Sequence, residues 1–397
     1  MTTTKNNEHK KLNAPNKQEQ NQTCLDSAER EGLRPKGNVP NLRFPEFQGE
    51  WEEYKIEDIT VNISSGRCKS HSSNGKYNLY GSTGIIGKTD EVCYEGNLVL
   101  VARVGANAGF LQIINEPCGI TDNTLIIKPK EVDVQYIYYF LQHFNLNRLI
   151  FGSGQPLITG GMLKKVKVSL GTIQEQNKIT RLLSLLDERI ATQSKIIEDL
   201  KKLKSAIIEK LYKGIQGTWY SYRQLFSIIN ERNKQLEYSN VLSASQERGM
   251  VSREDLNLDI HFERSNISTY KIVKNGDYVI HLRSFQGGFA FSEQTGICSP
   301  AYTVLRPNNL LVYGYLSNYF ISRDFVKSLI IVTYGIRDGR SINVDEWLDM
   351  KVVIPSKEQQ THIVNVIESI ENKIKNEETY SNCLLNQKQY MLRQMFI

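Results

Sequence analysis

The chain has 397 residues, which is enough for two or three domains that each bury a core. It is 40% hydrophobic and 23% charged, and its formal net charge of +6 permits a nucleic-acid partner without requiring one. No uninterrupted apolar run approaches the length of a membrane span, and no apolar export segment lies at the N-terminus, so we expect a cytoplasmic protein.

The first 38 residues are polar and rich in Asn, Gln, Lys and Glu. Such a segment cannot bury enough apolar surface to offset the loss of chain entropy. We therefore expect residues 1–38 to form a disordered leader, and ordered structure to begin near VPNLRFPEF.

Six cysteines are spread along the sequence without a CxxC pair or a cluster of histidines. They are Cys24, Cys68, Cys93, Cys118, Cys298 and Cys383. This spacing predicts reduced thiols, with neither a disulfide framework nor a zinc site.

The segment YGSTGIIGKTDE (80–91) ends in the Gly-Lys-Thr that is typical of phosphate-binding loops. A phosphate loop needs a second glycine five positions before Gly87, where this chain has Ser82. It must also open a helix, whereas an apolar strand-like run follows here. The segment therefore predicts a glycine-containing turn and not a nucleotide site.

Three apolar runs after this turn predict strands, and a helix is expected to follow them. The runs are LVLVAR (98–103), FLQII (110–114) and TLIIKP (124–129). The helix, 133–150, has Asp133 in the capping position. Its residues Ile137, Phe140, Leu141 and Phe144 share one face and are expected to enter a core.

Several segments of the chain occur twice. QGEW, ending at Trp51, recurs as QGTW, ending at Trp219, and GNLVLVARVGANAGF (96–110) recurs as GDYVIHLRSFQGGF (276–289). KVSLGTIQEQNKI (167–179) recurs 184 residues later as KVVIPSKEQQTHI (351–363). The repeat predicts a duplicated unit, each copy being a mixed α/β domain followed by a long helix. The counterpart of the 133–150 helix is expected over 312–330.

Both copies end in a long apolar stripe with steps of three and four residues, which is typical of a coiled coil. The first stripe is Ile179, Leu182, Leu186, Ile190, Ile197, Leu200, Leu203, Ile207 and Leu211, with Gln193 at one seam position. The second is Ile363, Val366, Ile370, Ile374, Leu384, Met391 and Met395. Two rods of roughly 58 Å suggest an antiparallel pair that holds two heads apart. The alternative is two amphipathic helices that pack only on their own domains.

No motif for catalysis is present among those we sought, which include methyl-transfer loops, HExxH and GxSxG. Glu371-Asn372-Lys373 matches the end of a nuclease motif but lies within the second stripe. His71, His143, His261 and His281 stand alone in the sequence. We therefore expect no catalytic site and no bound metal.

Loops in both copies combine Lys and Arg, which neutralise phosphates, with side chains that pair with base edges. In the first copy the candidate DNA contacts are Arg67, Lys69, Ser70, Lys76, Tyr80, Ser82, Thr83, Lys88, Arg103, Asn107 and Gln155. In the second copy they are Ser245, Gln246, Arg248, Arg283, Gln286, Arg337 and Arg340. Taken singly, each residue is also consistent with a solvated surface side chain.

The chain combines VPNLRFPEFQGEWEEYKIEDI, the YGSTGIIG turn, VLSASQERGMVSREDL and two EQ-type helix starts. On these segments, the sequence from residue 39 onwards resembles the specificity (S) subunit of type I restriction–modification systems. It implies target-recognition domains at 39–170 and 215–355, and conserved helices at 171–214 and 356–397. The fold expected is mixed α/β (α+β), with two similar domains joined by two long antiparallel coiled-coil helices in a pseudo-two-fold arrangement.

The resemblance also implies a function in defence against foreign DNA. Each domain would recognise one half of a split DNA target, while the helices set the spacer and dock two methyltransferase (M) subunits. S-adenosylmethionine, ATP and Mg²⁺ would belong to the M and restriction (R) subunits, and none to this non-catalytic chain. The implied docking residues are Glu175, Gln176, Gln359 and Gln360.

The sequence departs from the family pattern at two positions. Gly171 stands where a proline usually precedes the EQ motif, although Pro355 is present in the second copy. The second copy has Gln359 where the first has Glu175. Two other functions remain open, namely a coiled-coil scaffold whose heads bind protein and an enzyme with an unrecognised site.

Overall fold

The computed structural model describes residues 37–69, 72, 74–150, 155–245, 248–256, 264–281, 288–334 and 341–397. Apart from residues 37 and 38, the predicted leader lies outside this range. The chain divides into two units, each described by itself. Unit 1 comprises Met1–Asp187 and Asn386–Ile397, and unit 2 comprises Glu188–Leu385.

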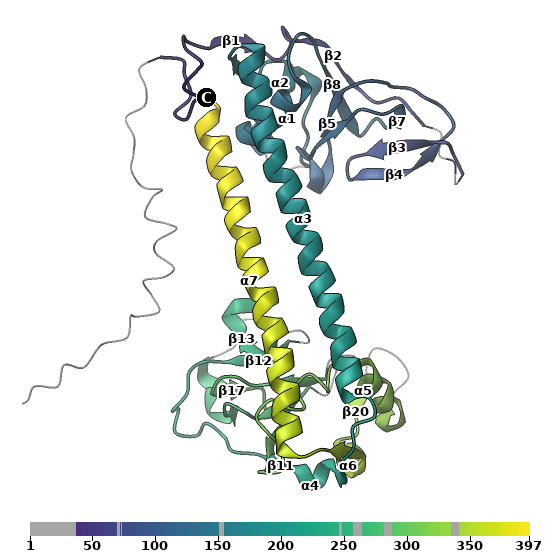
Figure 1. Ribbon diagram of the computed structural model, residues 1–397, viewed down its shortest axis with the longest axis vertical. Helices are drawn as coiled ribbons and strands as arrows, with labels where there is room; N and C mark the ends of the chain where they lie inside the picture. Colours follow the sequence, from purple (N-terminus) through teal and green to yellow (C-terminus); the bar gives the residue numbers. More distant parts are fainter. Residues whose placement is uncertain are drawn as a thin grey trace, which may run out of the picture. The chain divides into compact units, whose positions relative to one another are not determined.

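Unit 1 is built on a four-stranded antiparallel sheet in the order β2-β8-β5-β6, with a three-stranded sheet β4-β3-β7 beside it (Figure 1). The first sheet comprises β2 (Thr60–Ser65), β8 (Thr124–Pro129), β5 (Leu98–Ala102) and β6 (Leu111–Ile114). The second comprises β4 (Gly84–Thr89), β3 (Tyr77–Gly81) and β7 (Cys118–Ile120). A separate antiparallel pair joins β1 (Glu52–Lys55) to β9 (Lys167–Leu170). The three predicted strands are thus confirmed.

Strand β5 is buried along its whole length because both of its faces are covered. Val99 and Val101 enter the core beneath α1 (Val134–Phe144), whereas Leu98 and Leu100 enter a second cluster with residues of β7. This two-sided burial explains why the sequence of the strand is a continuous apolar run. Short helices complete the unit: η1 (Gly105–Asn107), η2 (Leu146–Leu149) and α2 (Gly160–Lys164).

Helix α1 starts where the sequence predicts, because an Asp133 carboxylate oxygen accepts hydrogen bonds from the backbone N–H groups of Gln135 and Tyr136. It ends earlier than the predicted residue 150. Asn145 adopts a left-handed conformation with φ 55° and stops the helix. Ile137, Phe140 and Leu141 are buried as expected.

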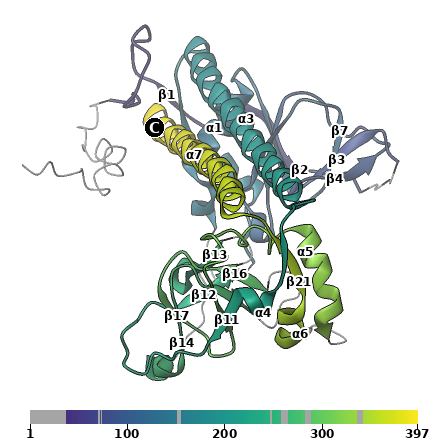
Figure 2. The same ribbon diagram turned by 60° about the horizontal axis from the view of Figure 1, so that its bottom comes forward.

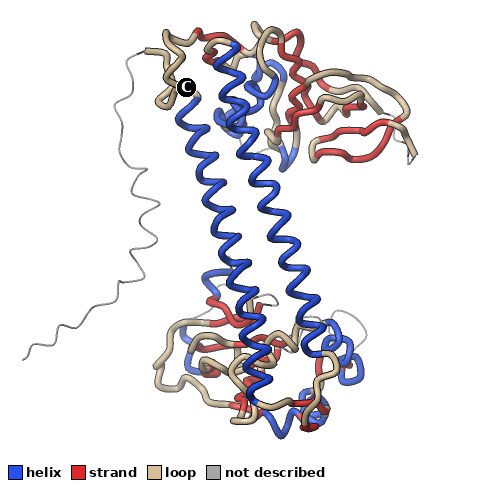
Figure 3. Tube along the Cα trace, in the orientation of Figure 1, coloured by secondary structure: helices blue, strands red, loops and turns tan. Residues whose placement is uncertain are grey.

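Unit 2 repeats this plan with shorter strands and more loop (Figures 2 and 3). Its four-stranded sheet has the order β11-β18-β15-β16, formed by β11 (Phe226–Ile229), β18 (Thr303–Pro307), β15 (Tyr278–Ile280) and β16 (Phe289–Phe291). The pair β10 (Thr218–Ser221) and β21 (Lys351–Ile354) corresponds to β1 and β9. The matching order of strands confirms the duplication.

The remaining elements of unit 2 are short. The strand pairs are β12 (Leu242–Ser245) with β13 (Gly249–Ser252), β14 (Lys271–Val273) with β17 (Gly296–Cys298), and β19 (Thr333–Tyr334) with β20 (Ser341–Ile342). The helices are α4 (Tyr222–Leu225), η3 (Arg253–Leu256), η4 (Arg264–Thr269), α5 (Arg323–Ser328), η5 (Leu329–Val332) and α6 (Val344–Asp349).

The helix predicted over 312–330 is wrong in extent. Gly314, at φ 71°, lies in a series of turns, and α5 begins only after Ser322, whose hydroxyl caps the N–H of Phe325. Helical spacing of apolar residues was therefore insufficient to predict a continuous helix here.

The two long helices are α3 (Ile173–Tyr212) and α7 (Lys357–Met395). Within unit 2 they run antiparallel, since Lys204 lies 2.6 Å from Glu371 and Lys201 lies 2.7 Å from Glu378. Within unit 1, Lys388 near the end of α7 lies 2.6 Å from Asp187 of α3. The predicted antiparallel pair is confirmed in each unit.

The predicted seam is correct only in part. Ile179, Leu186 and Gln193 are buried, but Leu203 is 50% exposed, and Leu183 and Ile208 are buried instead. A straight helix drifts relative to a strict seven-residue repeat, so the buried stripe shifts along its length. Among the described residues, no helix has the length and apolar character needed to cross a membrane.

Candidate nucleic-acid interface

The YGSTGIIGK segment forms the hairpin of β3 and β4, with Ser82 and Thr83 in the turn. Gly84 has a φ of 106° and lets the chain reverse, while Gln112 donates to the Gly81 carbonyl oxygen at 3.1 Å. The Gly-Lys-Thr at 87–89 lies in β4 and does not open a helix. The prediction of a turn in place of a phosphate loop is confirmed.

One face of this hairpin is held by Glu116. Its carboxylate accepts hydrogen bonds from Asn78 at 2.6 Å and Tyr80 at 2.7 Å, and Lys88 donates to Asn78 Oδ1 at 2.8 Å. Burial, with a smaller contribution from Glu116, raises the pKa of Tyr80 to about 12, whereas the Asn78 hydrogen bond helps to hold the pKa of Glu116 below its usual value. Tyr80 and Lys88 therefore already serve the hairpin, and their predicted DNA contacts stay predictions.

The basic residues of the preceding loop are exposed. Arg67, Lys69 and Lys76 project from the connection between β2 and β3, and the Lys76 ammonium lies 5.3 Å from the ring centroid of Tyr77. These side chains are free to contact phosphates without desolvating a buried charge.

Arg103, Asn107 and Gln155 come together on another edge of unit 1. The Arg103 carbonyl oxygen accepts from Ile158 N–H at 2.8 Å, and Gly105 N–H donates to the Pro156 carbonyl oxygen at 3.0 Å. Asn107 and Gln155 are exposed on these two joined segments. The fold thus unites candidates that are about 50 residues apart in the chain.

Arg103 has hydrogen-bonding capacity that the described part of the chain leaves unused. Its Nε is buried and has no acceptor among the described residues, and the same is true of the nearby Thr121 hydroxyl. Two apolar side chains beside it are exposed, Phe110 by 50% and Leu157 by 41%. A guanidinium flanked by amides and apolar groups suits the edge of a base pair, with its acceptors and methyl groups.

In unit 2 the described candidates lie at the turn between β12 and β13. Ser245 Oγ accepts from Arg248 N–H at 3.3 Å, and the Arg248 side chain is exposed. The other candidates in the two copies, Ser70, Gln246, Arg283, Gln286, Arg337 and Arg340, lie outside the described residues. The site in unit 2 is therefore known only at this turn.

Glu175, predicted to dock a partner, is fully buried inside unit 1. Arg43 donates to both of its oxygens, at 2.8 and 2.9 Å, and Trp51 Nε1 donates to Oε2 at 3.1 Å. The hydrogen bond to Glu175 raises the pKa of Arg43 above its ordinary value. Its second-copy counterpart, Gln359, is exposed.

Gln176 and Gln360 are buried at equivalent positions and make equivalent bonds. Gln176 Nε2 donates to the carbonyl oxygen of Gly171, and Gln360 Nε2 to that of Pro355, both at 3.0 Å. Gln360 also accepts from Val312 N–H at 2.8 Å. These side chains fasten the start of each long helix to its own unit, and docking by the four motif residues stays a prediction.

Residues 48–202 match the family model described as the type I restriction modification DNA specificity domain. This region is thus similar to type I DNA specificity domains. The chain is also similar to the type I restriction enzyme MjaVIII specificity subunit of Methanocaldococcus jannaschii, with 29% identity over 192 residues, 44% of each chain. A putative type I specificity subunit of Mycoplasma genitalium is 30% identical over 35% of this chain and 38% of its own. The matches thus span less than half of the length of these relatives.

The fold likeness extends beyond the specificity domain. The crystal structure of an S subunit from M. genitalium matches with a TM-score of 0.56 over 90% of this chain and 99% of that chain, at 15% identity. A chain from a study of type I R-M complex assembly gives a TM-score of 0.57 over 87% and 97%. The S-subunit fold predicted from the sequence is therefore confirmed.

Sequence reasoning missed the partners that position the specificity domain's motifs. Arg43 and Trp51 lie in the LRFPEF and QGEW segments, which carry the repeat and the resemblance but give no sign of a contact with Glu175. The charge pair Arg43–Glu175 spans 132 residues, so only the fold reveals it. Exposed Phe110 closes the repeated 96–110 segment, but its repeat counterpart Phe289 is buried, so the repeat alone gave no signal.

Proposed function

We propose that this chain is the DNA specificity subunit of a type I restriction–modification complex. The observation that carries the proposal is a duplicated unit in an S-subunit fold that covers 90% of the chain. A duplicated but divergent unit suits a DNA target made of two different halves. The chain itself is non-catalytic in this proposal, and methyl transfer and cleavage belong to M and R subunits that hold S-adenosylmethionine, ATP and Mg²⁺.

Recognition by unit 1 involves two kinds of contact. Arg67, Lys69 and Lys76 neutralise phosphates, which supplies affinity that depends on salt. Arg103, with Asn107 and Gln155 beside it, approaches base edges in the major groove, where a guanidinium forks onto guanine and an amide onto adenine. The exposure of Asn107 and Gln155 on the two joined segments beside Arg103 supports this assignment.

Replacing Arg103 by Ala tests the base contact. We expect a loss of about 1–3 kcal/mol of discrimination confined to the half-site bound by unit 1. Lys69→Ala, a control on an exposed cation, should weaken binding to all sequences and reduce its salt dependence. If Arg103→Ala weakens binding equally on every DNA sequence, Arg103 contacts a phosphate and not a base. Binding of the complex to protein but not to DNA would favour the scaffold function.

The spacing of the two half-sites is proposed to depend on α3 and α7. Removing residues 195–201 together with residues 369–375 deletes one seven-residue block from each of the two long helices. At 1.5 Å per residue the pair shortens by about 10 Å, or about three base pairs. We expect an altered spacer or loss of recognition, and an unchanged target would contradict this part of the proposal.

A further inference from the structure

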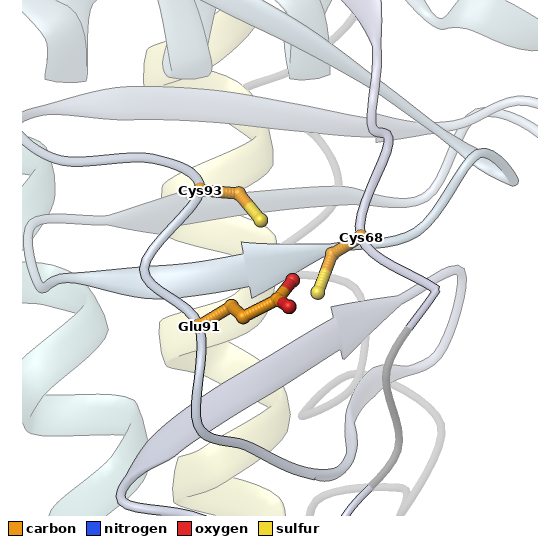
Figure 4. Close-up of side chains that lie close together, drawn as sticks. All are labelled: Cys68, Glu91 and Cys93. Atoms are coloured by element: carbon orange, nitrogen blue, oxygen red, sulfur yellow. The ribbon is translucent and has the colours of Figure 1, made fainter.

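Cys68 meets Glu91 and Cys93, two neighbouring residues from a later segment of the sequence, in unit 1 (Figure 4). Cys68 follows β2, whereas Glu91 and Cys93 follow β4. The two Sγ atoms and one carboxylate oxygen all lie within 4.8 Å of one another. This is the one such group of potential metal ligands found in the described part of the chain, and the sequence spacing had predicted none.

The backbone holds both cysteines against the same strand. Cys68 N–H donates to the Ile120 carbonyl oxygen at 2.9 Å, and Cys93 N–H donates to the Cys118 carbonyl oxygen at 3.1 Å. Both acceptors belong to β7, so the sheet fixes the distance between the two loops. The three side chains point toward one another from these anchored positions (Figure 4).

Gly119 of β7 leaves the space that the Cys68 thiol occupies. A Cβ at residue 119 would lie 2.8 Å from Cys68 Sγ and 2.9 Å from Thr89 Cγ2, which is closer than real Cβ contacts. A side chain there would displace the Cys68 thiol from its present position. The arrangement of the cluster thus depends on a third segment as well.

The chemistry of the cluster suits a borderline-soft divalent cation. Zn²⁺ binds thiolate sulfur at about 2.3 Å and carboxylate oxygen at about 2.0–2.2 Å, so two thiolates on one tetrahedral ion lie about 3.8 Å apart. The ligand atoms therefore need to close by about 1 Å at most.

We propose that Cys68, Cys93 and Glu91 form a zinc site in unit 1, with water as the fourth ligand. Two thiols lose their protons to solvent when the ion binds, and no electron transfer is involved. The ion fastens the basic loop with Arg67 and Lys69 to the segment after β4, and so orders one of the proposed phosphate contacts. Metal content does not depend on the proposed DNA function.

The test is metal binding by the full-length reduced chain. After incubation with Zn²⁺ and dialysis, elemental analysis should find one equivalent, and Cd²⁺ should give thiolate charge-transfer absorbance. Cys93→Ser should abolish both signals, and Glu91→Gln should weaken binding by about tenfold or more, since loss of even an outer-shell partner costs about 10–100-fold. Both substitutions are at exposed positions, which avoids the folding defect that a change at buried Cys68 risks.

Cys383→Ser is the matched control, because Cys383 is an exposed cysteine on α7 and belongs to no cluster of ligands in the described residues. It should bind zinc like the parent chain. Failure of the parent to retain zinc, or retention by Cys93→Ser, would overturn the proposal. A Cys68–Cys93 disulfide in chain isolated without oxygen would also overturn it, in favour of a redox pair.

Discussion

Gln193 and Glu377 occupy the same position in the two repeats, 184 residues apart, and they contact each other in unit 2. Gln193 Nε2 donates to the Glu377 side chain at 2.5 Å and to its carbonyl oxygen at 3.2 Å. In an antiparallel pair of repeated helices, only one position can face its own counterpart. Two ion pairs are related by the same offset, because Asp187 corresponds to Glu371 and Lys204 to Lys388. The nitrogen–oxygen distance is 2.6 Å in both pairs, Asp187–Lys388 and Lys204–Glu371.

Replacing Gln193 by Ala should therefore destabilise the helix pair. Gln193 is only 5% exposed, and loss of its hydrogen bonds should cost about 1 kcal/mol. In a Glu377→Ala background the cost should shrink, which chemical denaturation of the single and double variants can measure. Thr192→Ala, at the exposed neighbour, is the control. Equal effects at 192 and 193 would show that the contact contributes nothing.

The two copies of the EQ motif should respond differently to the same change. Glu175→Ala leaves the Arg43 guanidinium and the Trp51 indole N–H without their acceptor, and should cost about 2–3 kcal/mol of unfolding free energy. Gln359→Ala, at the exposed counterpart, should change stability by less than about 0.5 kcal/mol. Urea titrations of both variants make the comparison. A cost at Gln359 as large as that at Glu175 would contradict the internal role of Glu175.

Gly171 has no room for a side chain because the Glu175–Trp51 contact fills the space beside it. A Cβ at residue 171 would lie 2.4 Å from Glu175 Oε2 and 2.6 Å from Trp51 Nε1. Gly171→Ala should therefore lower the unfolding free energy by about 1–3 kcal/mol. Gly160→Ala is the control, since its nearest neighbours would be 3.7 Å away. If the two variants melt at the same temperature, the steric explanation fails.

Acid should destabilise the packing of the C-terminal residues of unit 1, because His143 becomes protonated. Its ring stacks on Phe396 with centroids 5.9 Å apart, and burial, with help from Arg148, lowers the pKa of His143 below its usual 6.5. The unfolded chain then binds the proton more readily, so this contribution to stability is present above about pH 6.5 and is lost as pH falls through the lower folded pKa. When the pH is lowered from 7.5 to 5.5, the melting temperature should drop more for the parent chain than for His143→Asn. An equal drop in melting temperature for the parent and the variant would show that His143 does not contribute to the acid destabilisation.

Sequence reasoning succeeded where a structure depends on neighbouring residues or on the repeat. Asp133 predicted the start of α1, and the offset of 184 predicted two long helices with matching ends. It failed where distant segments decide the outcome. The turn at Gly314 interrupts a helical apolar pattern, and tertiary packing moves the buried stripe away from Leu203.

In the candidate site, too, the sequence predicts which residues take part but not which of them lie close together. Residue types and loop composition identified Arg103, Asn107 and Gln155, but their proximity depends on the pairing of Val104 with Leu157. The meeting of Cys68 and Cys93 depends on hydrogen bonds to β7 and on space above Gly119, neither of which the cysteine spacing reveals. Pairing between strands distant in sequence is therefore the information that the repeat analysis lacked.

The methylome of a cell that contains this chain with an M subunit tests the central claim most directly. Two divergent units in one chain should give methylated adenine in a split motif, with two defined blocks separated by a spacer of fixed length. Substituting Arg103 by Ala should alter one block and leave the other unchanged. A single continuous motif, or methylation that is unchanged when this chain is omitted, would contradict the account.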